Sequence, residues 1–423
     1  MKRKYCSYTL TDFYLFKYQL LGFAKKFSNF CFLDNHDYEF DKSYDCIAGC
    51  GVIHSITSGE KNNLKLLDQF KKENKDWIFG HVSYDLKNEI ENLSSNKKDG
   101  IGFPDFCFYV PEIVFILSKE TVKIGVYGDI DTNKIFKEII STIPDKKVFI
   151  KPVIKSRLSK REYLNTIEKL QQHILRGDCY EICFCQEYFA KNIEIDTVNV
   201  FKRLCEISPN PFAAFYKLDE KYLLCASPER FLKKTGDVII SQPIKGTLKR
   251  SDKNIEGEKY WLETDEKERA ENVMIVDLVR NDLSKICAEG SVFVKEFLKI
   301  YSFPQVHQMI STIEGRVAEN ISFGEILSAT FPMGSMTGAP KKRVMELIEK
   351  YEKTKRGLFS GTVGYINPDG DFDFNVVIRS ILYNEKNHYL SIQTGSAITS
   401  KSIPEKEYEE CNVKREAMIN SLM

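Results

Sequence analysis

Four glutamates in two short helical patterns have the spacing that most directly indicates chemistry. Glu268 and Glu271 lie three residues apart in the helical block Glu266–Leu283, and Glu407 and Glu410 repeat that spacing near the end of the chain. Residues three apart share one face of a helix. If the two faces meet, the carboxylates repel one another unless protons or a cation neutralise them. Carboxylate oxygens suit Mg²⁺, so the spacing predicts a magnesium site for an acidic ligand.

Each glutamate pair also has a purely structural explanation. Acidic residues are favoured near a helix N-terminus, and Pro404 is typical of the first helical position. Only the presence of two matching patterns favours the metal site. The sequence contains no P-loop and no G-x-G-x-x-G, which argues against nucleotide phosphates as the ligand.

Three other segments place polar groups where an anion can bind. The glycine-containing turn Pro332–Lys341, which includes Thr337, leads directly into a helix and offers backbone N–H groups. Arg379 interrupts the apolar run Val376–Ile381, and a buried arginine needs a carboxylate partner. Tyr365 is a further polar group in an apolar strand, although an amphipathic core tyrosine fits the same pattern.

Lys245 stands in the stretch Gln242–Arg250, QPIKGTLKR, after the apolar run Val238–Ile240. Lysine is rarely buried without a partner, so a lysine in a turn usually extends its amine to solvent. A lysine held beside the four glutamates would instead be a candidate nucleophile, because a desolvated amine is a common covalent catalyst.

The bulk composition excludes several classes of function. The chain has 423 residues, 43% hydrophobic and 29% charged, with a net charge of +1. This balance does not favour binding to nucleic acid or to a membrane surface. No apolar run approaches the ~18 residues of a membrane span, and the N-terminus lacks the apolar segment of a signal peptide. The twelve cysteines lack C-x-x-C and zinc-finger spacing, so we expect free thiols in a cytoplasmic protein.

The elements that must position these groups follow from hydrophobic periodicity and capping. Ser159 and Glu162 form a capping box for a helix that ends near Gly177. Further helices are expected over residues 263–286, 323–330, 341–351 and 404–422. Strands are expected over residues 182–185, 212–216, 222–225, 238–240, 361–366, 372–382 and 389–393.

The predicted strands come in series rather than in strict βαβ alternation. This order favours an α+β fold over a Rossmann sheet. Residues 1–150 form an N-terminal region of short β-rich runs. The basic, proline-containing stretch Lys146–Lys160 indicates a linker to a second region, residues 159–420, which carries the motifs described above.

Six motifs together resemble those of the chorismate-utilising enzymes, a family that includes the large subunits of anthranilate and aminodeoxychorismate synthases and the isochorismate and salicylate synthases. They occur in family order: Ser227–Phe231, Pro243–Thr247, Ala270–Leu283, Gly334–Lys341, Val377–Arg379 and Pro404–Glu410. The N-terminal third matches weakly. The resemblance implies a sandwich of two large, mostly antiparallel β-sheets with outer helices and a chorismate site between the sheets.

The resemblance also implies roles for individual residues. It assigns Mg²⁺ to Glu271 and Glu410, with Glu268 and Glu407 in support. Gln308 stands where the family usually has a histidine, which leaves that histidine's role open. The substrate-binding residues that the resemblance implies, with Gln308 among them, are Thr337, Lys341, Tyr365, Arg379, Gly395 and Ser396.

Lys245 occupies the position that separates two activities within the family. Aminodeoxychorismate synthases have a lysine there, and anthranilate synthases usually have an alanine. The resemblance implies that Lys245 adds to C2 of chorismate as the C4 hydroxyl leaves, and that ammonia then adds at C4 and expels the lysine. An amine must be neutral to attack, so we expect a lowered pKa of Lys245. Glu229 is implied as the general acid, kept protonated by burial.

These features predict the synthase component of an aminodeoxychorismate synthase, which acts in p-aminobenzoate and folate synthesis. The sequence has no G-x-C-x-G around a cysteine, so we expect ammonia from a separate glutaminase subunit. Anthranilate synthase is an alternative that Lys245 opposes. Glu181 stands where isochorismate synthases have a lysine and argues against that activity. A non-catalytic chorismate-binding subunit is a further alternative, motivated by Gln308 and by Ala397 in place of a family glycine.

Overall fold

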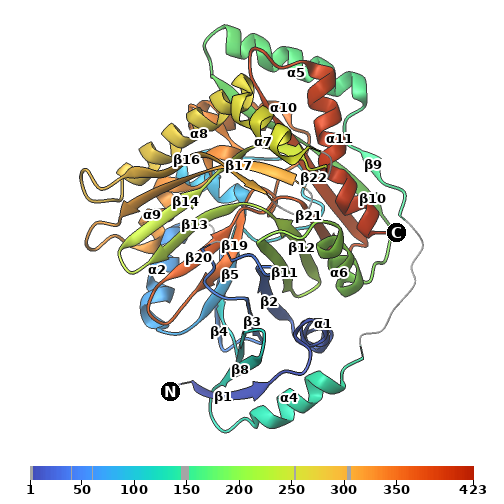
Figure 1. Cartoon of the computed structure of the whole chain (residues 1–423), viewed down its shortest axis with the longest axis vertical. Helices are drawn as coiled ribbons and strands as arrows, with labels where there is room; N and C mark the ends of the chain where they lie inside the picture. The colour runs from blue at the N-terminus through green and yellow to red at the C-terminus, as the bar shows by residue number, and fades with distance from the viewer. Residues whose placement is uncertain (1–2, 40, 60, 144–151, 252–253, 303–305) are drawn as a thin grey trace.

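The computed structural model describes residues 3–39, 41–59, 61–143, 152–251, 254–302 and 306–423. These residues form two large antiparallel β-sheets that pack face to face, with helices on the outside (Figure 1). The predicted α+β sandwich is confirmed. None of the described helices combines the length and the apolar content needed to cross a membrane.

The first sheet has twelve strands. Their order across the sheet is β1 (Lys4–Thr9), β8 (Thr121–Val126), β7 (Ile113–Leu117), β3 (Cys46–Cys50), β2 (Asn29–Asp34), β11 (Phe212–Leu218), β12 (Lys221–Ser227), β21 (Ser380–Asn384), β22 (Tyr389–Ile398), β10 (Glu181–Lys191) and β18 (Gly338–Ala339), with β9 (Lys155–Ser156) paired to β10.

The second sheet has ten strands. Their order is β15 (Ile244–Lys249), β17 (Val306–Arg316), β14 (Val238–Gln242), β13 (Arg230–Thr235), β20 (Phe372–Asn375), β19 (Thr362–Ile366), β5 (Ile78–Val82), β6 (Phe106–Val110) and β4 (His54–Thr57), with β16 (Phe293–Ser302) paired to β17.

The helices gather at two ends of the sandwich (Figure 1). One end carries α1 (Phe13–Ala24) and α4 (Thr132–Ser141), and the opposite end carries α5 (Lys160–Leu175), α7 (Ile255–Thr264), α8 (Glu266–Ser284), α10 (Lys341–Tyr351) and α11 (Pro404–Ser421). The remaining helical segments are α2 (Asn63–Glu73), α3 (Lys87–Ile90), α6 (Thr197–Ile207), α9 (Phe323–Thr330) and the 3-10 turns Tyr84–Leu86 and Gly334–Met336.

Strands that are covered on both faces explain the long apolar runs of the sequence. In β11, Ala214 and Tyr216 belong to the core between the two sheets, while Ala213 and Phe215 belong to a second core on the outer face. Helices α1, α4 and α6 cover that outer face and supply much of this second core. Alternate residues of one strand thus enter two different cores, because side chains alternate across a sheet.

The N-terminal third contributes strands to both sheets. Strand β2 pairs with β11, and β5 pairs with β19, so chain segments far apart in sequence share the same ladders. The expected regions 1–150 and 159–420 are therefore joined through both sheets, and the boundary between them stays a prediction. Residues 146–151 of the expected linker lie outside the described part of the chain.

Several predicted elements are confirmed. Helices α9 and α10 have the expected bounds, and the capping box of Ser159 and Glu162 opens α5. The single helix expected over 263–286 is wrong, because Asp265 has an extended backbone and caps α8 through a bond from the Glu268 N–H.

The single strand expected over 372–382 is also wrong. Strand β20 belongs to one sheet and β21 to the other, and the chain crosses between them at Arg379, whose φ is +51°. Arg379 therefore lies in a connection and not inside a strand. A positive φ is uncommon for a residue with a side chain, and such conformations cluster at functional sites.

Candidate active site

A cavity of about 300 Å³ lies where β15 and β22 meet helices α8 and α11. Most of the residues predicted from the sequence line it: Glu229, Lys245, Glu268, Glu271, Gln308, Arg379, Gly395, Ser396 and Glu410. Cys183, Lys267, Ser335 and Lys414 line the same cavity and were not predicted. The cavity therefore brings together Glu229 and Glu410, which belong to the first and the last motif and lie 181 residues apart in the chain.

The two glutamate pairs are linked through a lysine, and the expected cluster of four carboxylates stays a prediction. Lys267 joins them, with its Nζ 3.7 Å from Glu271 Oε1 and 3.2 Å from Glu407 Oε1. Burial raises the pKa of Glu268, and it raises that of Glu271 to about 7, because a charged carboxylate loses its hydration there. Glu407 contacts Lys267 rather than lining the cavity itself.

The carboxylates provide the chemistry of a magnesium site. Buried oxygens with no hydrogen-bond partner are uncommon, and Glu271 Oε1 and Glu407 Oε2 are two of them. Oxygen donors of this kind fit a hard cation, so the residues fit Mg²⁺. Within the described ranges, no group of three or more His, Cys, Asp or Glu side chains stands close enough to hold a metal. Lysine ammonium groups neutralise the glutamates in this arrangement.

Lys245 is part-buried, with 11% of its side chain exposed, and ion-paired rather than extended into solvent. Its Nζ donates a hydrogen bond to Glu181 Oε1 at 2.8 Å and lies 3.6 Å from Glu271 Oε2. Burial lowers its pKa, but the charges of Glu181 and Glu271 outweigh that effect, and the pKa is raised. The expected lowering of this pKa is therefore wrong for the arrangement described. Glu181 lies behind Lys245 and does not line the cavity.

Glu229 has the properties expected of a general acid. It is 4% exposed, and Ser335 Oγ donates a hydrogen bond to its Oε1 at 2.6 Å. Burial raises the pKa of Glu229 to about 7, although Ser335 and the charge of Lys245 oppose the rise. A carboxyl group with this pKa holds its proton through much of the neutral range.

The lysine of α11 supports the other side of the cavity. Lys414 Nζ donates to the Gly395 carbonyl at 2.9 Å and to Glu410 Oε1 at 2.5 Å. Arg379 reaches toward the same helix, with Nη1 3.4 Å from the Lys414 carbonyl. Lys267 precedes Glu271 by four residues, and Lys414 follows Glu410 by four residues. This i, i+4 spacing on a helix is the sequence signal that could have identified both lysines.

Gln308 and His307 lie on opposite faces of β17. Gln308 lines the cavity, and its Oε1 is buried without a hydrogen-bond partner. His307 points the other way, with Nδ1 2.9 Å from Ser302 Oγ and Nε2 3.4 Å from Glu258. His307 therefore does not replace the histidine that the family usually has at the position of Gln308.

Two residues of the glycine-containing turn do not line the cavity. Thr337 is fully buried and donates its hydroxyl to the Met333 carbonyl at 3.1 Å. Lys341 pairs with Asp282 at 2.5 Å and donates to the Thr330 carbonyl at 3.0 Å. Both side chains therefore hold the turn in place, and their expected contact with substrate stays a prediction.

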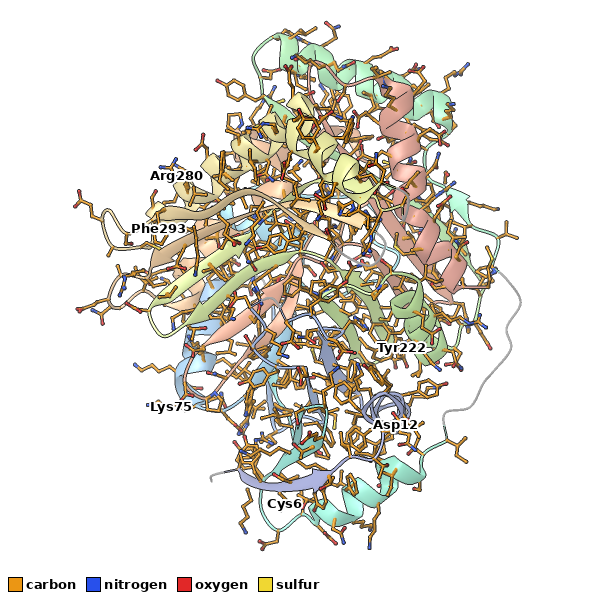
Figure 2. The ribbon with its side chains drawn as sticks, in the orientation of Figure 1. Cys6, Asp12, Lys75, Tyr222, Arg280 and Phe293 are labelled. Carbon is orange, nitrogen blue, oxygen red and sulfur yellow. The ribbon has the colours of Figure 1, made fainter. Side chains whose placement is uncertain are left out.

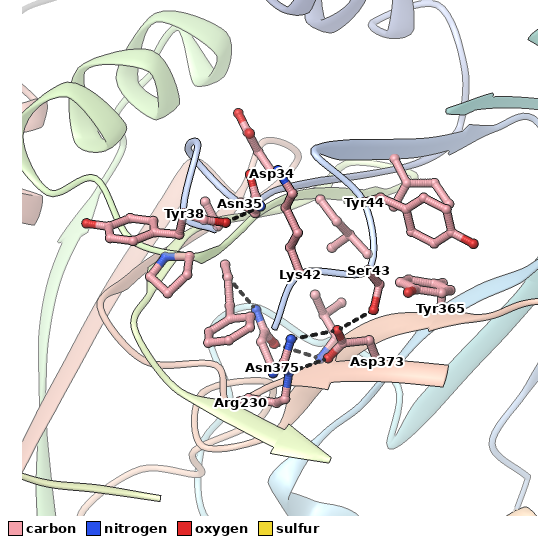
Figure 3. A pocket seen from close by; sticks show the side chains of 16 residues that line it. Asp34, Asn35, Tyr38, Lys42, Ser43, Tyr44, Arg230, Tyr365, Asp373 and Asn375 are labelled. Atoms are coloured by element: carbon pink, nitrogen blue, oxygen red, sulfur yellow. Dashed lines mark hydrogen bonds and ion pairs between the residues drawn. The ribbon is translucent and has the colours of Figure 1, made fainter. Parts of the chain in front are cut away.

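Tyr365 belongs to a second, smaller cavity of about 60 Å³ (Figure 3). Tyr365 lies on β19 and packs against Tyr44 and Trp77. Arg230 crosses this second cavity and binds Asp373 through its Nε at 3.0 Å. Tyr365 thus lines a different cavity from Lys245, and its expected contact with the substrate carboxylate stays a prediction.

The family model for chorismate binding enzymes matches residues 29–420. The chain belongs to this family. Its fold is shared with anthranilate synthase component I from Streptococcus pneumoniae, with a TM-score of 0.76, 24% identity and 92% of each chain covered.

Relatives of the chain carry two different names within the family. The chain is 36% identical over 373 residues to the chloroplastic aminodeoxychorismate synthase of Arabidopsis thaliana, covering 81% of this chain and 40% of that protein. It is 30% identical to aminodeoxychorismate synthase component 1 of Bacillus subtilis, covering 81% of this chain and 76% of that protein. Anthranilate synthase component 1 of Thermus thermophilus is 31% identical, with 82% of this chain and 77% of that protein covered.

Overall identity therefore does not separate the two activities. The chain spans 40% of the length of the Arabidopsis protein.

Proposed function

We propose that the chain is the synthase component of an aminodeoxychorismate synthase. It converts chorismate and ammonia into 4-amino-4-deoxychorismate and water. The observation that carries this proposal is the ion-paired Lys245 amine in the same cavity as Glu229, a carboxyl group whose pKa of about 7 suits a general acid. A lysine is the residue that the resemblance associates with amination at C4.

The first step forms a covalent adduct. The Lys245 nitrogen bonds to C2 of chorismate, the ring double bond shifts, and the C4–O bond breaks. Glu229 gives its proton to the departing hydroxyl, which leaves as water. The Lys245 ammonium loses two protons, one before it attacks and one after the C2–N bond forms, and these pass to the two carboxylates that contact it, Glu181 and Glu271.

The second step releases the lysine. Ammonia bonds to C4, the double bond shifts back, and the C2–N bond to Lys245 breaks. The leaving amine takes a proton as it departs, and the added nitrogen loses one. Oxygen leaves at C4 and nitrogen replaces it there, so no oxidant or reductant is consumed.

The remaining cavity residues bind and orient the acid groups of the substrate. Arg379 supplies a cation, and backbone groups at Gly395 and Ser396 supply hydrogen bonds. Glu271 and Glu410 would hold Mg²⁺, with Glu268 and Glu407 in support, and the bound ion would neutralise a substrate carboxylate. Gln308 can orient the substrate by hydrogen bonding but cannot transfer a proton.

Ammonia would come from a separate glutaminase subunit, and the product would serve p-aminobenzoate and folate synthesis. The test is chromatography of the products that the purified chain forms from chorismate, Mg²⁺ and an ammonium salt. We expect 4-amino-4-deoxychorismate. Anthranilate as the main product would assign the chain to the other nitrogen chemistry, and no product would favour a non-catalytic chorismate-binding subunit.

A further inference from the structure

The hydrogen bond between Glu181 and Lys245 joins the two sheets at the cavity. Glu181 begins β10 of the twelve-stranded sheet, and Lys245 lies on β15 of the ten-stranded sheet. Their Nζ–Oε1 distance is 2.8 Å, and Glu181 is 1% exposed. The position of the nucleophilic amine is therefore set by a residue from the opposite sheet.

Glu181 is the closest partner of the Lys245 amine. Among the described residues, Lys245 Nζ makes its one hydrogen bond to Glu181. Glu271 lies farther away, at 3.6 Å, and also pairs with Lys267. A lysine side chain has four rotatable bonds, so the amine can move between the two carboxylates. Without the hydrogen bond to Glu181, the charge of Glu271 would attract the amine toward itself.

A buried ion pair of purely structural type has both carboxylate oxygens satisfied. Glu352 is such a case nearby, because Arg356 donates to both of its oxygens and Cys185 N–H adds a third bond. Glu181 differs, since its Oε2 is buried without any partner. An incompletely satisfied buried carboxylate is costly, which indicates a role beyond packing.

We propose that Glu181 is the positioning residue for the Lys245 amine and thereby directs nitrogen to C4 of the substrate. This inference rests on the proposed function. With Glu181 in place, the amine stays where it can bond to C2, and ammonia finds only C4 open. Without Glu181, the amine turns toward Glu271, C2 becomes open, and ammonia can add there although Lys245 is still present.

The test compares Glu181→Ala and Glu181→Gln with the wild-type chain and with Lys245→Ala. Two quantities are measured: the ratio of 4-amino-4-deoxychorismate to anthranilate, and the fraction of chain carrying the covalent adduct by intact-mass spectrometry. We expect Glu181→Ala to reduce the adduct at least about tenfold and to shift the product ratio toward anthranilate. Glu181→Gln should recover part of the adduct and part of the wild-type product ratio, because its amide oxygen still accepts a hydrogen bond from Lys245.

Glu187→Gln is the matched control. Glu187 lies on the same strand, is 4% exposed, and pairs with Arg157 at 2.6 Å outside the cavity. This control breaks a buried ion pair of β10 but should leave the product ratio unchanged. A merely structural role of Glu181 would slow the whole reaction without changing the ratio.

Failure of the inference and failure of the proposed function give different results. If the wild-type chain makes no 4-amino-4-deoxychorismate, the proposed function is wrong. If it does, and Lys245→Ala changes the ratio while Glu181→Ala leaves ratio and adduct unchanged, only the inference is wrong. If Glu181→Ala does not fold, Glu181→Gln decides: a wild-type adduct yield and an unchanged product ratio overturn the inference, and a lowered adduct yield with a product ratio shifted toward anthranilate supports it.

Discussion

At the scale of single residues, the charge of Lys245 is the first question that the cavity raises. Glu181 and Glu271 keep the amine protonated, whereas attack on carbon needs a neutral amine. In the proposed reaction the same carboxylates that bind the ammonium group are also the groups that can take its proton. In that reaction Glu181 and Glu271 first hold the Lys245 ammonium group in position and then accept its protons.

Lys245→Ala should convert the nitrogen chemistry in part from C4 to C2. The substitution opens C2 to ammonia, and loss of pyruvate then gives anthranilate. We expect less 4-amino-4-deoxychorismate, some anthranilate and a slower total rate, since each tenfold loss corresponds to about 1.4 kcal/mol of barrier. The measurement is chromatography of the products formed from chorismate, Mg²⁺ and ammonium.

Lys295→Ala is the control for that substitution. Lys295 also has a glutamate partner, Glu314, at 2.8 Å, but lies outside the cavity on β16. Its products should match those of the wild-type chain. Aminodeoxychorismate formation by Lys245→Ala at the wild-type rate would show that Lys245 is no nucleophile.

Glu229 should make the reaction depend on pH around neutrality. Its acid form is present below its pKa of about 7, so kcat/KM should fall as the pH rises above 7. Glu229→Gln cannot donate a proton and should lose about 100-fold or more in kcat while keeping its fold by circular dichroism. A variant that retains wild-type activity at pH 8 would remove Glu229 from the reaction.

The same raised pKa also affects stability. In the folded chain Glu229 binds its proton more tightly than in the unfolded chain, so ionisation of this carboxyl does not lower the unfolding free energy below about pH 4.5. Between pH 4.5 and 7 the unfolding free energy falls as the unfolded chain loses this proton first, and above pH 7 the loss is constant, on the order of 3 kcal/mol. Glu229→Gln should therefore show a smaller decrease in unfolding free energy from pH 5 to pH 8 than the wild-type chain, in urea titrations. An equal decrease in both would show that Glu229 is not buried as a neutral acid.

At the scale of elements, the signals that are local in sequence were sufficient to predict structure. Helices α9 and α10 have capping residues or a proline at their starts, and their predicted bounds agree with the structure. The prediction of a single strand over 372–382 was wrong because an apolar stretch does not reveal that the chain changes sheets at Arg379. The cavity that Tyr365 lines was not predictable for a related reason: alternation in β19 shows that the strand has two faces, but not which cavity each face lines.

Helices α8 and α11 should create the metal dependence together. Glu271→Gln and Glu410→Gln each remove one carboxylate from the cavity, so each should weaken Mg²⁺ binding at least about tenfold. Activity should fall with the fold intact, and the rise in melting temperature that Mg²⁺ causes should shrink. Both effects are measured by Mg²⁺ titration, with rate and thermal unfolding as separate readouts.

Exposed glutamates of the same helices serve as controls. Glu266→Gln on α8 and Glu409→Gln on α11 make the same chemical change outside the cavity. Their Mg²⁺ dependence should match that of the wild-type chain. Full activity of Glu271→Gln and Glu410→Gln in the presence of a chelator would contradict the metal assignment.

At the scale of the whole molecule, the cavity depends on pairings that no local pattern shows. Strands β10 and β15 lie in different sheets, and the Glu181–Lys245 hydrogen bond joins them across 64 residues of sequence. The six motifs identified the family and most of the cavity residues. The contacts between those residues could not be predicted, because they depend on how the two sheets pack and on which helices close their end.

The purified chain should use ammonium salts but not glutamine. Amide hydrolysis by a glutaminase needs an activated cysteine nucleophile, and no cysteine here stands in a G-x-C-x-G sequence. Eleven of the twelve cysteines are buried, and the exposed Cys6 lies at the end of the molecule opposite Arg280 of α8 (Figure 2).

Product formation from chorismate and Mg²⁺ is measured with either nitrogen source, at several pH values, because free ammonia rather than ammonium is the nucleophile. Addition of a separate glutaminase should restore turnover with glutamine, which shows that the chain itself is competent. Turnover with glutamine by the chain alone, in the presence of an enzyme that removes free ammonia, would show that this chain generates and channels its own nitrogen.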